Sequence, residues 1–266
     1  DLLQKIEPEN TVNDLIGQME VEIEKDRNSA VGWRYLMQPW LRTPLMIAVC
    51  IMFFQQFVGI NTVIYYSPKI FLMAGFESTL SAIWASVGIG IVNVVFTVIS
   101  LYLVDRIGRR KLYFIGLSGI AFSVLCLSAC FIYANQLGEI GRWLMVIFMF
   151  GYVAFFAISI GPLGWLVISE IFPQKVRGLG TSIGSLAVWI FNCIVSFTFF
   201  KIIDFFSIPG TEIVVGQTTS ENPAGAFFLY GFIAVLGLVW GYLFLPETKG
   251  LSLEEIEQKW RKNREC

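Results

Sequence analysis

Six apolar stretches, each long enough to cross a lipid bilayer, constrain this chain more than any other feature of its sequence. The hydrocarbon core of a bilayer is about 30 Å thick and needs about 20 apolar residues in a helix. The stretches cover about residues 44–68, 80–104, 112–134, 143–171, 179–203 and 224–245. We therefore predict an all-α membrane protein with six transmembrane helices.

The composition agrees with a membrane protein and excludes several classes of function. Charged residues make up only 15% of the chain, whereas soluble domains contain about 25%. The net charge of −1 gives no indication of a nucleic-acid partner. Histidine, the commonest metal ligand and general base, is absent. The sequence also contains no nucleophile–base pair or cluster of metal ligands, so we expect neither an enzyme nor a bound cofactor or metal.

The positions of the basic residues predict how the chain is oriented. Assigning residues 1–43, 105–111, 172–178 and 246–266 to one side of the membrane collects 16 of the 19 Lys and Arg residues there. Basic residues accumulate in cytoplasmic loops. Both termini are therefore expected in the cytoplasm of a multi-pass protein of the plasma membrane or a bacterial inner membrane.

Three regions follow from this orientation. Residues 1–43 would form a cytoplasmic linker, residues 44–245 the transmembrane bundle and residues 246–266 a cytoplasmic tail. Apolar residues at helical spacing between Val12 and Ile23 predict an amphipathic helix in the linker, and the sequence SLEE predicts the start of another in the tail. The chain begins without a methionine or a signal peptide, and we expect it to be part of a longer protein.

The first apolar stretch contains more polar side chains than a lipid-facing helix tolerates. Within QQFVGINTVIYYS it carries Gln55, Gln56, Asn61, Tyr65 and Tyr66. Polar groups in hydrocarbon are costly unless they are satisfied, so these side chains should face the bundle or a water-filled cavity. A single Asn could equally bond one helix to another, but five polar residues within twelve positions favour the lining of a cavity.

Two helix breaks are predicted. On an ideal helix Gln56 and Asn61 lie about 140° apart, so both can approach a small ligand only if the cavity is wide or the helix is broken. Gly59 tolerates the backbone conformations that a break requires, and we predict irregular structure beginning there. In the fourth stretch Pro162 follows Gly161, removes a backbone donor and clashes with the preceding turn, which predicts a second break.

The breaks and the remaining polar residues together indicate the kind of ligand. Each predicted break lies in the first helix of a set of three, which suggests two three-helix inverted repeats with a site at their interface. Amides donate and accept hydrogen bonds, and the C–H face of a sugar ring stacks on indole. The spans carry almost no ionisable side chain away from their ends. We therefore predict a neutral polyhydroxyl ligand such as a sugar.

Charged motifs recur at the expected cytoplasmic ends of the helices. They are VDRIGRRKL, SEIFPQKVRG and LPETKG, which supply Asp105, Arg106, Arg109, Arg110, Glu170, Arg177, Glu247 and Lys249. Basic residues alone would reflect only the orientation of the chain, but here acids accompany them. Such clusters can pair in one conformation and separate in another, and we interpret them as a conformational latch.

These motifs resemble the C-terminal half of sugar porters of the major facilitator superfamily, which include facilitative glucose transporters and bacterial sugar–proton symporters. The resemblance covers essentially the whole chain and rests on QQFVGINTVIYYS, VDRIGRRKLYFIG, GPLGW, SEIFPQKVRG and PETKG in the family's order. It implies a fold of twelve helices in two halves. The six spans here would be helices seven to twelve, with the lipid bilayer and an N-terminal six-helix half as partners, and transport would proceed by alternating access.

The resemblance also implies roles for individual residues. The residues expected to contact the sugar are Gln55, Gln56, Asn61, Asn93, Phe156, Trp165, Trp189 and Asn192. Those expected to form an extracellular gate are Tyr65 and Tyr66. The intracellular latch would comprise Asp105, Arg106, Arg109, Arg110, Glu170 and Arg177. Ala157 stands where many facilitative glucose transporters carry glutamate. Gly164 stands where the animal ones carry proline, and together with SEIFPQKVRG this favours a microbial or plant relative.

Two alternatives to facilitated transport of a hexose or pentose remain open. Proton symport requires a titratable group within the membrane, and that group would lie in the other half because these six spans show none. A non-transporting sugar sensor would keep the binding residues and add signalling tails. A single half carries only part of the sugar contacts, so we expect it not to transport alone.

Overall fold

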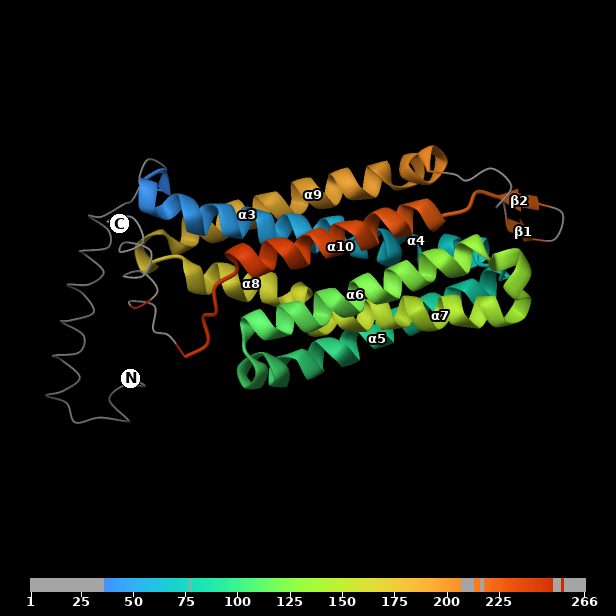
Figure 1. Cartoon of the computed structure of the whole chain (residues 1–266), viewed down its shortest axis with the longest axis horizontal. Helices are drawn as coiled ribbons and strands as arrows, with labels where there is room; N and C mark the ends of the chain where they lie inside the picture. The colour runs from blue at the N-terminus through green and yellow to red at the C-terminus, as the bar shows by residue number, and fades with distance from the viewer. Residues whose placement is uncertain (1–35, 77, 207–212, 216–217, 251–254, 256–266) are drawn as a thin grey trace, which may run out of the picture.

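The computed structural model describes residues 36–76, 78–206, 213–215, 218–250 and 255. Within them the chain forms a helical bundle with six helical spans long and apolar enough to cross a membrane (Figure 1). The prediction of an all-α membrane protein with six spans is confirmed. The amphipathic helices predicted in the linker and the tail lie outside the described residues, apart from Glu255.

Two of the six spans consist of more than one α-helix. The first is η2 (Pro39–Leu41), α3 (Arg42–Phe57) and α4 (Ile60–Met73), followed by α5 (Thr79–Ile107) and α6 (Arg109–Ile132) as the second and third. The fourth is α7 (Ala134–Ile158) and α8 (Ile160–Ile171), the fifth η3 (Gln174–Val176) and α9 (Arg177–Phe205), and the sixth α10 (Ala224–Phe244). The sequence did not predict β1 (Ile213–Val215) and β2 (Thr218–Ser220), an antiparallel pair between α9 and α10.

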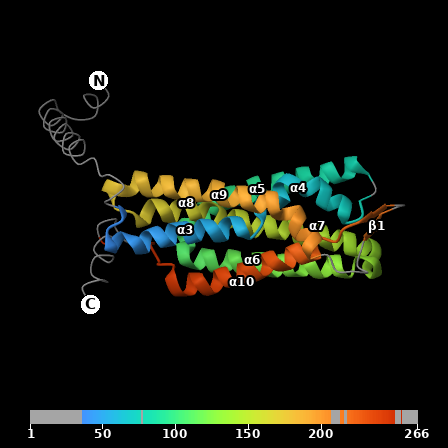
Figure 2. The same ribbon diagram turned by 90° about the horizontal axis from the view of Figure 1, so that it is seen from above.

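The basic segments of the described chain lie at one end of the bundle. There α3 begins, α5 meets α6, α8 meets α9 and α10 ends, while α6 meets α7 and the β-hairpin lies at the opposite end (Figures 1 and 2). We call the end of the bundle at which α3 begins and α10 ends the basic end. Successive spans run in opposite directions, as the distribution of Lys and Arg requires. The assignment of the basic end to the cytoplasm stays a prediction.

The first predicted break is confirmed at Gly59. Helix α3 ends at Phe57, α4 begins at Ile60, and Gly59 adopts a φ of +87°, which side chains rarely allow. A Cβ at this position would lie 2.3 Å from the ring of Tyr230 on α10. Glycine is therefore required here both by the left-handed backbone and by the close approach of the Tyr230 ring.

The second predicted break is confirmed, but it lies at Ser159 and Pro162 follows it. Ser159 separates α7 from α8 with φ −128° and ψ −105°. Pro162 occupies the first turn of α8, where a helix needs no backbone donor. Its ring would clash with the carbonyl four residues earlier, which belongs to Ile158, the last residue of α7. The proline thus prevents α7 from continuing rather than distorting its own turn.

The packing of the helices relates the two sets of three spans. Helix α3 packs on α9 and α7 packs on α5, while α6 and α10 pack on each other. The first span of each set thus contacts the second span of the other set, as expected for the predicted inverted repeats. Helix α5 leaves most of its apolar side chains exposed, among them Trp84, Val94 and Leu101.

Candidate functional site

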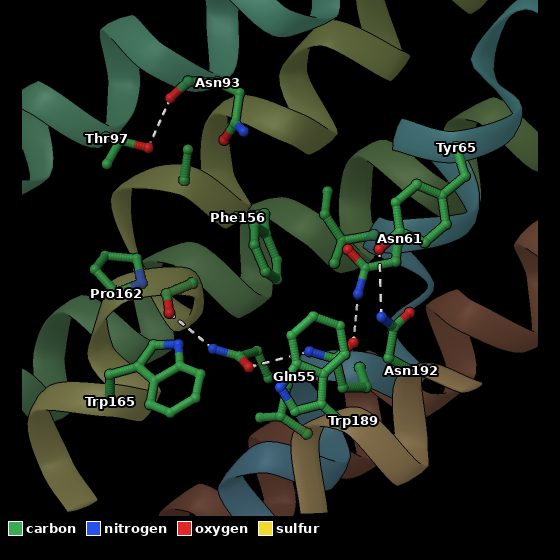
Figure 3. Close-up of a pocket in the computed structure, with 15 residues that line it drawn as sticks. Gln55, Asn61, Tyr65, Asn93, Thr97, Phe156, Pro162, Trp165, Trp189 and Asn192 are labelled. Carbon is green, nitrogen blue, oxygen red and sulfur yellow. Dashed lines mark hydrogen bonds between the residues drawn. The ribbon is translucent and has the colours of Figure 1, made fainter. Parts of the chain in front are cut away.

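A cavity of about 350 Å³ lies between the two helix breaks (Figure 3). This volume lies at the lower end of the range for small-molecule pockets. The lining residues are Gln55, Gln56, Ile60, Asn61, Tyr65, Asn93, Thr97, Phe156, Ala157, Gly161, Pro162, Trp165, Val188, Trp189 and Asn192. Amides, hydroxyls and aromatic rings provide its polar and stacking groups, and none of the lining residues carries a charge.

All eight residues that the sequence analysis assigned to sugar contacts lie on this cavity. Their part in binding stays a prediction, but residues from six helices do converge on one space. The sequence analysis did not assign six other residues to the lining, which are Ile60, Thr97, Ala157, Gly161, Pro162 and Val188. Thr97 lies one helical turn after Asn93, and its hydroxyl donates to the Asn93 carbonyl oxygen at 2.7 Å. This spacing on α5 was the available signal, since residues i and i+4 share a helix face.

A chain of hydrogen-bonded amides crosses the floor of the cavity (Figure 3). Asn61 Nδ2 donates to Gln56 Oε1 at 2.5 Å, and Gln56 Nε2 donates to Gln55 Oε1 at 3.2 Å. Gln55 Nε2 then donates to two carbonyl oxygens of α8, at 3.0 Å to Ile160 and 2.7 Å to Gly161. The break at Gly59 therefore brings together Gln56 and Asn61, which an unbroken helix would hold apart.

The direction of the hydrogen bonds between these amides determines which donors and acceptors remain free for a ligand. Gln55 Nε2 already donates to two carbonyls, and an amide nitrogen carries only two hydrogens. The amide oxygens of Gln55 and Gln56 each accept one bond and keep a second lone pair. Asn61 Oδ1 accepts no hydrogen bond from the part of the chain that the structure describes. The amide chain thus offers mainly acceptors, which suit the O–H donors of a hydroxylated ligand.

Gly164 makes the contact between Gln55 and α8 possible. A Cβ at Gly164 would lie 2.9 Å from Gln55 Nε2 and 3.3 Å from the Met52 sulfur. Both distances are too short for ordinary packing, so a side chain here would displace the Gln55 amide from the helix. The glycine that distinguishes GPLGW from the animal pattern thus has a local structural role.

Aromatic side chains form the exposed walls of the cavity. Trp165 on α8 and Trp189 on α9 are 41% and 67% exposed, and Tyr65 on α4 is 53% exposed. Tyr65 is joined to α9, because its hydroxyl oxygen accepts from Asn192 Nδ2 at 3.3 Å. The described chain therefore leaves one side of the cavity uncovered, with indole faces available for stacking.

The two predicted gate residues point to different surroundings. Tyr65 lines the cavity, whereas Tyr66 does not. The Tyr66 ring stacks on Phe199 of α9 with centroids 5.6 Å apart, and its hydroxyl donates to the Ser196 carbonyl at 3.4 Å. Of the predicted pair, only Tyr65 is in a position to cover a ligand in this conformation.

At the basic end, the predicted latch residues Arg109 and Glu170 form the central ion pair. Arg109 Nη2 and Nε lie 2.8 and 3.2 Å from Glu170 Oε1. The other carboxylate oxygen accepts from the Thr248 hydroxyl at 2.5 Å, and both Arg109 and Glu170 are largely buried. Arg109 also pairs with Asp105 at 3.3 Å, but Asp105 is 78% exposed, so this second pair contributes little.

Glu247 caps helix α6 from outside the helix. Its carboxylate accepts from the backbone amides of Arg109 and Arg110 at 3.1 and 3.2 Å. These amides belong to the first turn of α6, where they have no partner within the helix and where negative charge is stabilised. A Cβ on Gly108, which has a φ of +95°, would lie 3.0 Å from Glu247. The motifs DRIGRR and PETKG thus fit together at this helix end.

The remaining predicted latch residues form fewer side-chain contacts within the described chain than Arg109 and Glu170 do. Arg106 contributes its carbonyl oxygen, which accepts from Lys249 Nζ at 2.7 Å, and Arg110 donates to the Tyr242 carbonyl at 2.8 Å. Neither Arg106 nor Arg177 forms a side-chain ion pair with a residue in the described ranges. The Nε and Nη2 atoms of Arg177 are shielded from solvent without a described partner. The role of these residues in a latch stays a prediction, since charge alone does not determine where a long side chain points.

Comparison with known proteins gives consistent matches. Residues 1–260 match the family model described as sugar (and other) transporter. The chain is 38% identical over 229 residues to the glucose transporter GlcP of Staphylococcus epidermidis, covering 86% of this chain and 47% of GlcP. It is 35% identical over 241 residues to the D-xylose-proton symporter of Escherichia coli K12, covering 91% of this chain and 46% of the symporter.

Solved structures give the same result for the fold. A crystal structure of a double-tryptophan mutant of XylE matches with a TM-score of 0.73 and 35% identity, over 93% of this chain and 49% of that one. The chain spans about half the length of the curated relatives that it matches.

Proposed function

Because this chain belongs to the sugar porter family of the major facilitator superfamily, we propose that it forms six helices of an integral membrane transporter for a monosaccharide, either a hexose or a pentose. The whole transporter would contain a second six-helix half. The six spans would then occupy the positions of helices seven to twelve, with the basic end in the cytoplasm.

The observation that carries this proposal is the uncharged, acceptor-rich cavity between the two helix breaks. A bound anion would need a basic side chain and a cation an acidic one, and the lining contains neither. Amide oxygens that accept from ligand hydroxyls, beside the exposed indoles of Trp165 and Trp189, suit a neutral sugar ring. The named activities of the two relatives, glucose transport and D-xylose–proton symport, support the same ligand class.

Transport would proceed by alternating access around this cavity. The described chain covers the ligand from one side only, since Tyr65, Trp165 and Trp189 remain exposed. The second half would cover the other side and pack against the exposed apolar faces of α5 and α9. Rocking of one half against the other would then open the site to each side of the membrane in turn.

The ion pairs at the basic end would stabilise one of the two conformations. Contacts of Arg109, Glu170, Glu247 and Thr248 hold the ends of α6, α8 and α10 together within this chain. Arg109 also donates to the Val104 carbonyl near the end of α5. Arg177 has shielded donors without a described partner, and we propose that it contacts the second half when the cytoplasmic side is closed.

A proton-coupled mechanism is the second candidate, and the name of the D-xylose-proton symporter favours it. None of the residues that line the cavity is an acidic residue, a histidine, a lysine or an arginine. A proton carrier acting on this site would therefore come from the second half.

The test is uptake of labelled hexoses and pentoses by the complete protein that carries this chain, reconstituted in liposomes with and without an imposed proton gradient. Accumulation above equilibrium that disappears with the gradient would establish symport. Equilibration that does not respond to the gradient would establish facilitated diffusion. Saturable sugar binding without flux would contradict transport and support a sensor.

A further inference from the structure

Tyr152 of α7 contacts the break between α3 and α4 from outside the broken span. Its hydroxyl donates to the Val58 carbonyl oxygen at 2.8 Å, and its side chain is completely buried. We propose that Tyr152 is a positioning residue for the ligand site, which acts by holding the break at Val58–Gly59 in the geometry that brings Gln56 and Asn61 together. Tyr152 does not line the cavity, so it would act on the ligand only through these residues.

The break creates the need for such a residue. A helix that stops leaves its last carbonyls without the amide donors of a following turn. In a membrane no water in the surrounding hydrocarbon can replace them, and each unsatisfied group is costly. At this break the Gly59 amide donates back to the Gln56 carbonyl, and the Thr62 hydroxyl donates to the Gly59 carbonyl. The Val58 carbonyl lies between these two local bonds and takes its donor from another helix.

The break is thus held from two sides. The Tyr152 hydroxyl from α7 holds its carbonyl, and the Tyr230 ring from α10 occupies the space next to Gly59. Gly59 therefore lies between a hydrogen bond and an aromatic ring. Both tyrosines are buried to at least 98%, so neither has an alternative partner in water.

The break in turn determines the geometry of the site. Gln56 lies two residues before Val58 and Asn61 three residues after it, and their side chains meet at 2.5 Å. A change in the backbone angles at Val58 or Gly59 rotates α4 relative to α3 and separates the two amides. The amide chain that continues to Gln55 and α8 would then be interrupted.

The two broken spans support each other in this way. Gln55 on the first span donates to the carbonyls that follow the Ser159 break, and Tyr152 on the fourth span donates to the carbonyl at the Val58–Gly59 break. Each break is therefore stabilised by a side chain from the other broken span. A movement at one break is transmitted to the other through these contacts.

The test removes only the hydroxyl, in the Tyr152→Phe variant of the complete protein that carries this chain. Sugar affinity is measured by the change in tryptophan fluorescence on titration with the monosaccharide that the uptake assay identifies. We expect affinity to fall about fivefold, the factor that corresponds to one net hydrogen bond. This measurement rests on the proposed function, since it needs a sugar that the unmodified protein binds.

Tyr113 provides a matched control on the same scaffold. Its hydroxyl also donates to a backbone carbonyl, that of Gly237 at 3.0 Å, and its side chain is also completely buried. This bond joins α6 to the middle of α10 and touches no break. Tyr113→Phe should lower stability to a similar extent and change sugar affinity less than twofold. Equal loss of affinity in both variants would overturn the proposal.

A double variant separates positioning from a general structural role. The Asn61→Ala variant lacks the amide that the break places next to Gln56, so the geometry of the break no longer affects this contact. Adding Tyr152→Phe should then reduce affinity less than twofold, compared with fivefold in the unmodified background. Independent, multiplicative effects of the two substitutions would show that Tyr152 does not act through the site.

A second measurement needs no sugar and distinguishes failure of this inference from failure of the proposed function. Hydrogen–deuterium exchange of the amides between residues 56 and 63 should be about fivefold faster in Tyr152→Phe, the same factor for one net hydrogen bond, and unchanged in Tyr113→Phe. Unchanged exchange in both variants would overturn the positioning role, whether or not the protein binds a sugar. Faster exchange in a protein that binds no sugar would support the role of Tyr152 at the break and contradict the proposed sugar transport.

Discussion

Replacing Gly59 by alanine should disrupt the protein through two separate effects at one atom. The first is backbone strain, because a φ of +87° costs a residue with a Cβ about 1–2 kcal/mol. The second is a clash, because the new Cβ would lie 2.3 Å from the ring of Tyr230. Insertion of one carbon into a packed interior costs about 1–3 kcal/mol. Together the effects should lower the free energy of unfolding by about 2–5 kcal/mol.

The chain contains a matched control for this substitution. Gly90 on α5 has ordinary helical geometry, and a Cβ there would meet no atom within 4 Å. Gly90→Ala should therefore leave stability unchanged or raise it by up to about 1 kcal/mol. Thermal unfolding of both variants in detergent, followed by tryptophan fluorescence, measures the difference. The same samples show whether Gly59→Ala retains sugar binding, which we expect it to lose.

Two results would refute this reasoning. Gly59→Ala with the stability of the unmodified protein would show that the break does not need glycine. Equal destabilisation by Gly59→Ala and Gly90→Ala would show that the loss does not depend on the break. Truncation of the ring in a Gly59→Ala, Tyr230→Leu double variant should recover the part of the loss that is due to the clash, while the backbone strain should persist.

Three further predictions concern the site and the basic end. Gln55→Ala should weaken sugar binding, with about 1 kcal/mol lost for each hydrogen bond to the ligand, and unchanged affinity in a titration would remove Gln55 from the site. Glu247→Ala should lower the free energy of unfolding by about 1–2 kcal/mol, because the first amides of α6 lose their cap. The melting temperature measures this loss, and Glu221→Ala on the exposed surface serves as the control. The purified chain alone should carry no sugar across liposomes, since it covers the ligand from one side only, and measurable saturable flux would contradict the proposal that a second half is needed.

The helix breaks show how far local sequence patterns lead. Gly59 indicated the first break directly, because the residue that tolerates a left-handed backbone is also the residue that occupies it. Pro162 indicated the second break without fixing its position, and the irregular residue lies three residues earlier in the chain. A proline acts on the turn that precedes it, so the sequence marks the start of the new helix, and the irregular residue is Ser159.

The side chains that bind the backbone carbonyls at these breaks could not be predicted from the sequence. Tyr152 lies 94 residues from Val58 in the chain, and Gln55 lies 106 residues from Gly161. Nothing in the neighbourhood of Tyr152 distinguishes it from a tyrosine that only fills the core. The hydrogen bond from Thr248 to Glu170 and the contact of Glu247 with the first amides of α6 were not predictable for the same reason.

The sequence alone therefore determined the properties that depend on each segment by itself. Apolar length decides which segments span the membrane, and the identities of Gly59 and Pro162 decide which of those spans cannot continue as helices. The tertiary structure decided which donor satisfies which carbonyl and which amides meet across the cavity. Hydrogen bonds act over about 3 Å, and only the packing of distant helices brings their donors and acceptors within that distance.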